Sequence, residues 1–272
     1  MGFGKYQEDI VSRYVRDTRD REPLLGAPVT PQEIKSKPDT MQGTKSMKGL
    51  KQFQMSAPRP LPVIVLADVS GSMAADGKIE ALNSALKDMI RAFADQSRLR
   101  AEIQVGLITF GGESAQAHLP LAPAHQIAHL DSLKAEGRTP MGHAMELATR
   151  LLEDKELIPS RAYRPVLVLV SDGQATDDWK EAFKCMQASD RSGKAARFAM
   201  AIGADADETM LKSFANDPEA PLFKANNARD IHRFFQAVTM SVTLKSQSPN
   251  PDPSAVFTIP ELPDDDPMDL DF

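Results

Sequence analysis

An acidic side chain and two hydroxyl side chains follow an apolar run early in the chain. The segment 63–73 reads VIVLADVSGSM, so Asp68, Ser70 and Ser72 have the spacing D-x-S-x-S. Oxygen side chains at positions i, i+2 and i+4, just after a buried strand, can converge on one point, and ligands of open α/β sheets bind at this edge. Hard cations take oxygen ligands. The segment therefore predicts a cation site, although taken alone it is equally compatible with a turn or a helix N-cap.

Two later segments place further oxygen side chains in similar positions. Thr139 lies in the loop GRTPMG, immediately before a helical pattern. Asp172 follows the apolar run VLVLV and precedes a glycine. Each segment has an ordinary interpretation on its own, as an N-cap for Thr139 and as a turn for Asp172. Their order, with each at a strand end or a helix start, favours a shared site.

Together the three segments resemble the von Willebrand factor A (VWA) family and its metal-ion-dependent adhesion site (MIDAS), written D-x-S-x-S, then T, then D. The resemblance covers residues 61 to about 242 and assigns the metal site residue by residue to Asp68, Ser70, Ser72, Thr139 and Asp172. It implies that the carboxylates act largely through bound water and leave one coordination position open. We expect Mg²⁺, with Mn²⁺ or Ca²⁺ as alternatives. The open position would accept a carboxylate from a partner protein.

The resemblance implies a protein-binding module and not an enzyme. D-V-S-G-S is not the G-x-S-x-G segment of hydrolases, and P-loop and dinucleotide fingerprints are absent from the sequence. His125 and His129 have the spacing of a zinc-binding helix, but Gln126 stands where such helices carry glutamate, so we interpret this segment as a solvated helix face. A hydrolase that uses the cation as Lewis acid remains the less favoured alternative.

The nearest group is the prokaryotic tellurite-resistance-type VWA proteins. This grouping implies a kinase or phosphatase partner in stress or phage-defence signalling. A VWA subunit that couples to an AAA+ ATPase, as in chelatase and MoxR systems, is the main alternative.

Composition limits the other function classes. The net charge of −6 argues against generic nucleic-acid binding. The sequence has no apolar run of membrane-spanning length and no signal-peptide pattern at its start, so we expect a cytoplasmic protein without a membrane contact. A lone cysteine, Cys185, gives no disulfide framework, and we expect it to be buried in a helix.

Strand and helix patterns alternate from residue 61 onward. Apolar runs predict strands at 62–68, 102–110, 116–120, 164–171, 196–202 and 221–224. Helical spacing predicts helices at 76–96, 123–131, 141–155, 177–192, 206–216 and 228–242. The order predicts an α/β fold with a doubly wound, mostly parallel, six-stranded sheet, in which 116–120 is a short antiparallel edge strand.

The predicted VWA domain spans 61–242, and an extension lies on each side of it. The first, 1–60, has a possible amphipathic helix at 5–19, and residues 34–59 carry six basic side chains and one acid. The second, 243–272, is rich in proline, and its residues 246–272 carry seven acids and no lysine or arginine. We expect both extensions to be flexible and solvated, with a basic docking arm and an acidic docking motif as the sharper alternatives.

Overall fold

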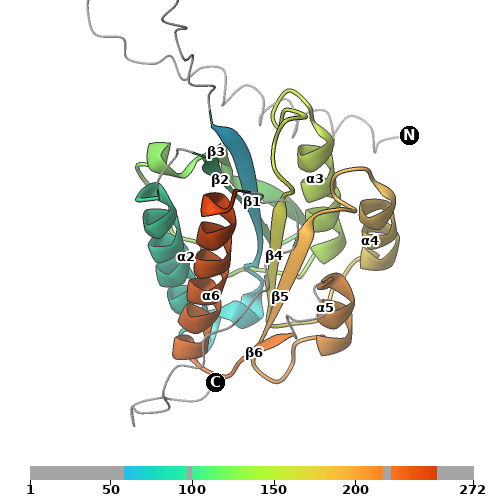
Figure 1. Cartoon of the computed structure of the whole chain (residues 1–272). Helices are drawn as coiled ribbons and strands as arrows, with labels where there is room; N and C mark the ends of the chain where they lie inside the picture. Colours follow the sequence, from blue (N-terminus) through green and yellow to red (C-terminus); the bar gives the residue numbers. More distant parts are fainter. Residues whose placement is uncertain (1–57, 97–99, 217–221, 250–272) are drawn as a thin grey trace, which may run out of the picture. The chain divides into compact units, whose positions relative to one another are not determined.

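Five parallel strands and one antiparallel strand form the sheet in the computed structural model (Figure 1), which describes residues 58–96, 100–216 and 222–249. The strand order is β3-β2-β1-β4-β5-β6. The strands are β1 (Arg59–Asp68), β2 (Ala101–Gly111), β3 (Ser114–Pro123), β4 (Val166–Ser171), β5 (Ala196–Ile202) and β6 (Phe223–Ala225). This confirms the predicted α/β class and the antiparallel edge strand β3. The predicted helix at 5–19, the basic arm up to residue 57 and the tail from 250 lie outside the described residues.

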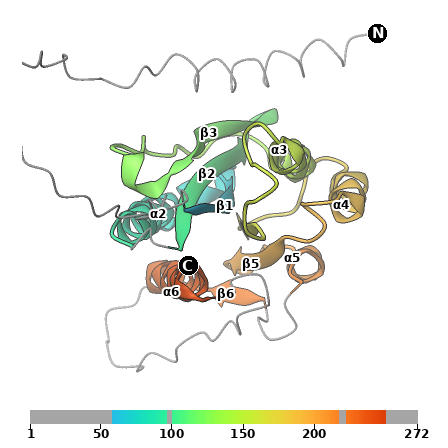
Figure 2. The same cartoon turned by 45° about the horizontal axis from the view of Figure 1, so that its top comes forward.

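Helices cover both faces of the sheet, which explains the continuous apolar runs in its central strands. They are α2 (Lys78–Ala94), α3 (Met141–Glu153), α4 (Trp179–Ala188), α5 (Glu208–Phe214) and α6 (Ala228–Gln247). In Figures 1 and 2, α2 and α6 lie together on one face, and α3, α4 and α5 lie on the other. Alternate residues of β1 face opposite sides of the sheet. Val63 and Val65 belong to a core cluster that also contains residues of α2 and α6, whereas Ile64 is fully buried but lies outside that cluster.

The start of β1 and the end of α6 lie at the same edge of the sheet. Arg59 is paired with Ala101 in the β1–β2 ladder, and the side chain of the adjacent Arg100 donates to the carbonyl oxygen of Gln247 at 2.6 Å. At this edge Lys245 also donates to the carbonyl oxygen of Arg164 at 3.0 Å. The carboxyl ends of the strands, where the predicted cluster lies, form the opposite edge.

One predicted helix is wrong. Within 123–131 the chain forms only a three-residue 3-10 turn, η2 (Ala124–Gln126). The chain beyond it is held by a side chain that is distant in sequence: Asn83 accepts from the backbone N–H of Leu133 at 2.7 Å and donates to the carbonyl oxygen of Leu133 at 3.1 Å. The side chains of Leu130 and Leu133 are buried although the chain around them is irregular. Their apolar spacing therefore reflects tertiary packing and not a helix. His125 and His129 are solvent-exposed, as expected, but they do not share a helix.

Other differences are smaller. Strand β3 has ten residues and is longer than the predicted 116–120, and α6 continues past residue 242 to Gln247. Cys185 is exposed and not buried, because α4 turns Ala182, Phe183 and Met186 toward the core and leaves Cys185 on its outer side. Among the described helices, none has the length and apolar character needed to cross a membrane.

Candidate metal centre

The pairing of β1 with β4 brings the two predicted acids together. The two strands are parallel neighbours, with Ala67 paired to Val170, so both chains leave the sheet side by side at its carboxyl edge. Asp68 is the last residue of β1, and Asp172 immediately follows β4. After Asp68 the chain enters a short 3-10 turn, η1 (Gly71–Ala74), which includes Ser72. Acids about a hundred positions apart in sequence therefore share one site.

Hydrogen bonds connect four of the five predicted residues. The Ser72 hydroxyl donates to Asp172 Oδ1 at 2.7 Å, and the hydroxyl oxygens of Ser70 and Ser72 lie 3.1 Å apart. The backbone N–H of Ser70 donates to Asp68 Oδ1 at 2.8 Å, and the Ser171 hydroxyl donates to Asp68 Oδ2 at 2.5 Å. Asp68 and Asp172 are almost completely inaccessible to solvent, at 0% and 1% exposed.

Thr139 reaches the same space from the loop before α3. A Cβ atom placed on Gly173 would lie 3.7 Å from the Thr139 hydroxyl oxygen and 3.9 Å from that of Ser72. Both hydroxyls thus lie beside the same glycine. The backbone of Thr139 is held by Thr176, whose side-chain oxygen accepts from the Thr139 N–H at 3.2 Å and whose N–H donates to the Thr139 carbonyl oxygen at 2.9 Å. The structure therefore brings all five predicted residues to one place.

Glycines position the Thr139 loop by close backbone contact. Gly137 has φ +68°, and a Cβ atom on it would meet Gly112 Cα at 2.4 Å. The Gly112 N–H donates to the Glu136 carbonyl oxygen at 2.9 Å, and the Glu136 N–H donates to the carbonyl oxygen of Val69 at 2.7 Å. The segment that carries Thr139 is thereby fixed to the end of β1 and the β2–β3 turn. Gly137 lies in the loop that the sequence predicts, but its contact with Gly112 was not predicted.

Lys78 and Ser171 are residues of the site that the sequence did not predict, and Lys78 is the charged one. Its ammonium nitrogen lies 3.0 Å from Asp172 Oδ2, and its side chain is only 12% exposed. Lys78 is the first residue of α2, where the helix dipole disfavours a positive charge. A lysine at the start of a helix, close in sequence to a predicted acidic cluster, was the available signal.

Burial controls the electrostatics of the cluster. Desolvation raises the pKa of Asp68 from 3.8 to about 6, against the hydrogen bonds from Ser171 and Ser70, which lower it. The nearby Asp172 carboxylate raises the pKa of Asp68 slightly further. Asp68 accepts from Ser70 and Ser171, Asp172 accepts from Ser72, and the Ser70 and Ser72 hydroxyls connect the two acids. Two buried acids this close are costly unless a positive charge compensates them.

The donor set fits a hard divalent cation. Three neutral hydroxyls and two carboxylates, all of them oxygen donors, lie together at the carboxyl edge, and oxygen ligands of this kind suit Mg²⁺ or Mn²⁺. Within the described ranges, no group of three or more His, Cys, Asp or Glu side chains could hold a metal. The centre therefore has neither the nitrogen and sulfur ligands of zinc sites nor a cage of carboxylates.

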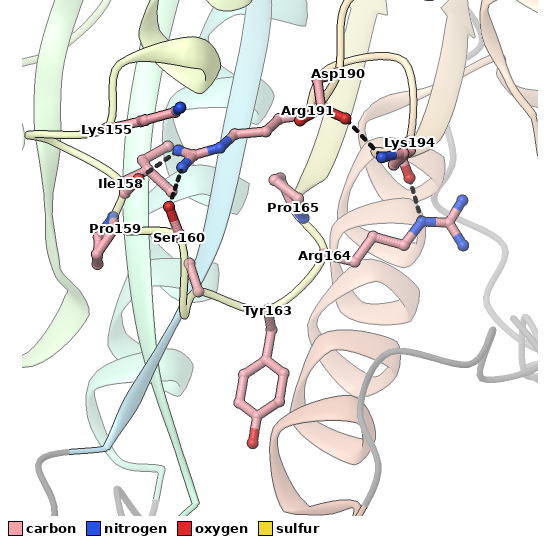
Figure 3. Close-up of a pocket in the computed structure, with 11 residues that line it drawn as sticks. Lys155, Ile158, Pro159, Ser160, Tyr163, Arg164, Pro165, Asp190, Arg191 and Lys194 are labelled. Carbon is pink, nitrogen blue, oxygen red and sulfur yellow. Dashed lines mark hydrogen bonds and ion pairs between the residues drawn. The ribbon is translucent and has the colours of Figure 1, made fainter.

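A basic cavity of about 370 Å³ lies at the opposite edge of the sheet, beside the amino ends of β4 and β5 (Figure 3). Its Arg191 donates to the carbonyl oxygens of Leu152 and Ile158 and contacts the Ser160 hydroxyl at 3.4 Å. Arg164 donates to the carbonyl oxygen of Lys194. These guanidinium groups connect the loops before β4 and β5, so we assign them a structural role and not part of the candidate centre.

Comparison with known proteins gives a clear family match. The profile of the von Willebrand factor type A domain matches residues 63–237, a range that contains the whole cluster. Over 116 residues the chain is 35% identical to the uncharacterized protein Rv2850c of Mycobacterium tuberculosis, a match that covers 42% of this chain and 18% of that protein. The chain thus spans less than a fifth of the length of this relative.

Solved structures show the same fold at low sequence identity. A von Willebrand factor type A protein from Catenulispora acidiphila has a TM-score of 0.54 and 21% identity, and the match covers 69% of this chain and 43% of that one. Proximal thread matrix protein 1 from the mussel byssus, described with a zinc-occupied MIDAS motif, has a TM-score of 0.52 and 18% identity, with coverage of 69% and 46%. At these identities the likeness establishes the fold alone.

Proposed function

Because the chain belongs to the von Willebrand factor type A family, we propose that it is a protein-binding module that depends on a divalent cation. The observation that carries the proposal is the convergence of Ser70, Ser72 and Thr139 with two buried carboxylates at the carboxyl edge of the sheet. The protein-binding role is that of the domain family. The cation dependence rests on the chemistry of this cluster.

In this proposal the three hydroxyls and the two acids hold the cation together. Ser70, Ser72 and Thr139 are neutral donors, and Asp68 and Asp172 act directly or through bound water. Mg²⁺ suits this set first and Mn²⁺ second, with Ca²⁺ as the third choice. When bound, the cation would supply an electrophilic coordination position that accepts an acidic side chain of a partner protein. The zinc described in the MIDAS motif of the mussel protein supports a divalent cation at this place in the fold.

For the partner we propose a kinase or phosphatase of a prokaryotic stress or defence pathway, with the protein acting in the cytoplasm. The resemblance to tellurite-resistance-type VWA proteins supports this choice, and the bacterial relative supports a prokaryotic setting. Capture of an AAA+ ATPase in place of a kinase or phosphatase would favour the chelatase or MoxR alternative. We propose no catalytic residue.

Isothermal titration with MgCl₂ and with MnCl₂ tests the cation site. We expect one site in the wild-type protein and no binding by Asp68→Ala or by the double variant Ser70→Ala/Ser72→Ala. Asp131→Ala, which removes an exposed acid elsewhere, serves as the matched control and should bind like the wild type. Equal binding by all four proteins would refute the assignment of the site.

A further inference from the structure

Lys78 places a fixed positive charge within the candidate centre. Its ammonium group lies 3.0 Å from Asp172 Oδ2, and Asp172 Oδ1 accepts from the Ser72 hydroxyl at 2.7 Å. The two oxygens of one carboxylate therefore face a lysine on one side and the predicted metal ligands on the other. Any cation held by Ser72 and Asp172 would stand within a few ångströms of this ammonium group.

The position of Lys78 is determined by three elements. Its backbone begins α2, with its N–H donating to the Ala75 carbonyl oxygen at 3.2 Å. A Cβ atom placed on Gly203, the residue after β5, would lie 3.6 Å from the Lys78 ammonium nitrogen. The side chain is thus enclosed by the helix start and by the ends of β4 and β5. A lysine held in this way keeps its charge close to Asp172 and cannot readily move into bulk water.

The net charge of the site depends on Lys78. With both carboxylates ionised, Asp68, Asp172 and Lys78 together carry one negative charge, whereas the two acids alone carry two. A divalent cation then gives the site one net positive charge, and the same site without Lys78 would be neutral. Like charges at this separation in a buried environment repel strongly. A positive charge at Lys78 would therefore disfavour a divalent cation beside it and would leave the loaded site with a charge that a partner carboxylate could neutralise.

We propose that Lys78 is a resident counter-ion of the metal site, which stabilises the metal-free protein and weakens the binding of a divalent cation by itself. The inference rests on the proposed function, because it concerns the same site. It also predicts that the cation and the acidic partner bind cooperatively. The bound cation leaves the site with one net positive charge, and the partner carboxylate neutralises that charge.

Titration of MgCl₂ into charge variants of Lys78 tests the inference. Lys78→Gln keeps a hydrogen-bond donor and removes the charge, Lys78→Met removes both, and Lys78→Arg keeps the charge. We expect Lys78→Gln and Lys78→Met to bind Mg²⁺ about tenfold more tightly than the wild type, and Lys78→Arg to bind within about twofold of it. Lys87→Met, which changes an exposed lysine of the same helix, is the control and should behave like the wild type.

Thermal unfolding without metal supplies the second readout. Removal of one member of a buried ion pair should lower the melting temperature of Lys78→Met by about 10 °C, and added Mg²⁺ should recover most of that loss. A lysine with a structural role alone would lower the melting temperature without tightening Mg²⁺ binding. Lys78→Gln is the variant to use if Lys78→Met fails to fold.

The outcomes separate this inference from the proposed function. If the wild type binds Mg²⁺ and Lys78→Gln binds no more tightly, the inference is wrong and the metal site stands. If only Lys78→Gln binds, the inference holds and metal binding by the wild type alone is refuted. If neither protein binds Mg²⁺ or Mn²⁺, both are wrong.

Discussion

Replacement of Asp68 by asparagine should make the metal-free protein more stable at neutral pH. Burial raises the pKa of Asp68 to about 6, compared with 3.8 for an ordinary aspartate. The native state therefore binds this proton more tightly than the unfolded chain does. The stability that the proton provides is complete below pH 4 and is lost as the pH rises through 6. At pH 7.5 the ionised acid costs on the order of 3 kcal/mol, since each pKa unit is worth about 1.4 kcal/mol.

The local hydrogen bonds permit this change. An asparagine oxygen can accept from the Ser70 N–H as Asp68 Oδ1 does, over 2.8 Å. Its amide nitrogen would meet the Ser171 hydroxyl, which already lies 3.4 Å from the Gly173 carbonyl oxygen and can donate there. Asp68→Asn should therefore remove the charge and keep the fold.

We expect the free energy of unfolding of metal-free Asp68→Asn to exceed that of the wild type by about 1–3 kcal/mol at pH 7.5, and to equal it near pH 4. Urea unfolding at several pH values measures this difference, with Asp131→Asn as the exposed-acid control. Added Mg²⁺ should raise the free energy of unfolding of the wild type at pH 7.5 and leave that of Asp68→Asn unchanged, because we expect only the wild type to bind the cation. A variant that is less stable than the wild type at pH 7.5, or a difference that does not depend on pH, would refute the reasoning.

Three further results are expected. Thr139→Ala should weaken Mg²⁺ binding about tenfold in calorimetry and leave the melting temperature without metal nearly unchanged, because it removes one ligand hydroxyl and keeps the backbone hydrogen bonds between Thr139 and Thr176; a large fall in melting temperature would show that the Thr139 side chain is structural. Gly137→Ala should destabilise the protein by about 2–4 kcal/mol in urea unfolding, because Gly137 has φ +68° and a Cβ atom would meet Gly112 Cα at 2.4 Å. An unchanged midpoint would mean that the loop relaxes without cost. Partner capture from a lysate of the source cells should fail in EDTA and recover with Mg²⁺; capture that ignores EDTA would place the binding surface elsewhere.

The sequence predicts most of the fold because the strongest signals are local. Strands β1 and β4 are continuous apolar runs, and their ends carry the acids, so a parallel sheet brings Asp68 and Asp172 to one edge. The confirmed antiparallel edge strand β3 follows from the short connection through Gly111 and Gly112.

What the sequence does not predict depends on contacts between distant residues. The helix predicted at 123–131 fails because the Asn83 side chain holds the backbone of Leu133. Lys78 belongs to the site only because its ammonium group contacts Asp172, which follows β4 and lies 94 positions later in the chain. Spacing along one segment contains no information about such pairs.

The common edge of the start of β1 and the end of α6 has a practical consequence for experiments. Helix α6 has 20 residues, so its two ends lie about 30 Å apart. Its first residue follows β6, near the carboxyl edge that holds the candidate centre. An affinity tag, a fluorophore or a surface tether attached before Arg59 or after Gln247 thus joins the domain far from Asp68 and Thr139. Immobilisation of the described domain at Arg59 or Gln247 should leave the carboxyl edge facing solution, so a tethered domain offers a direct test of whether that edge captures acidic partners.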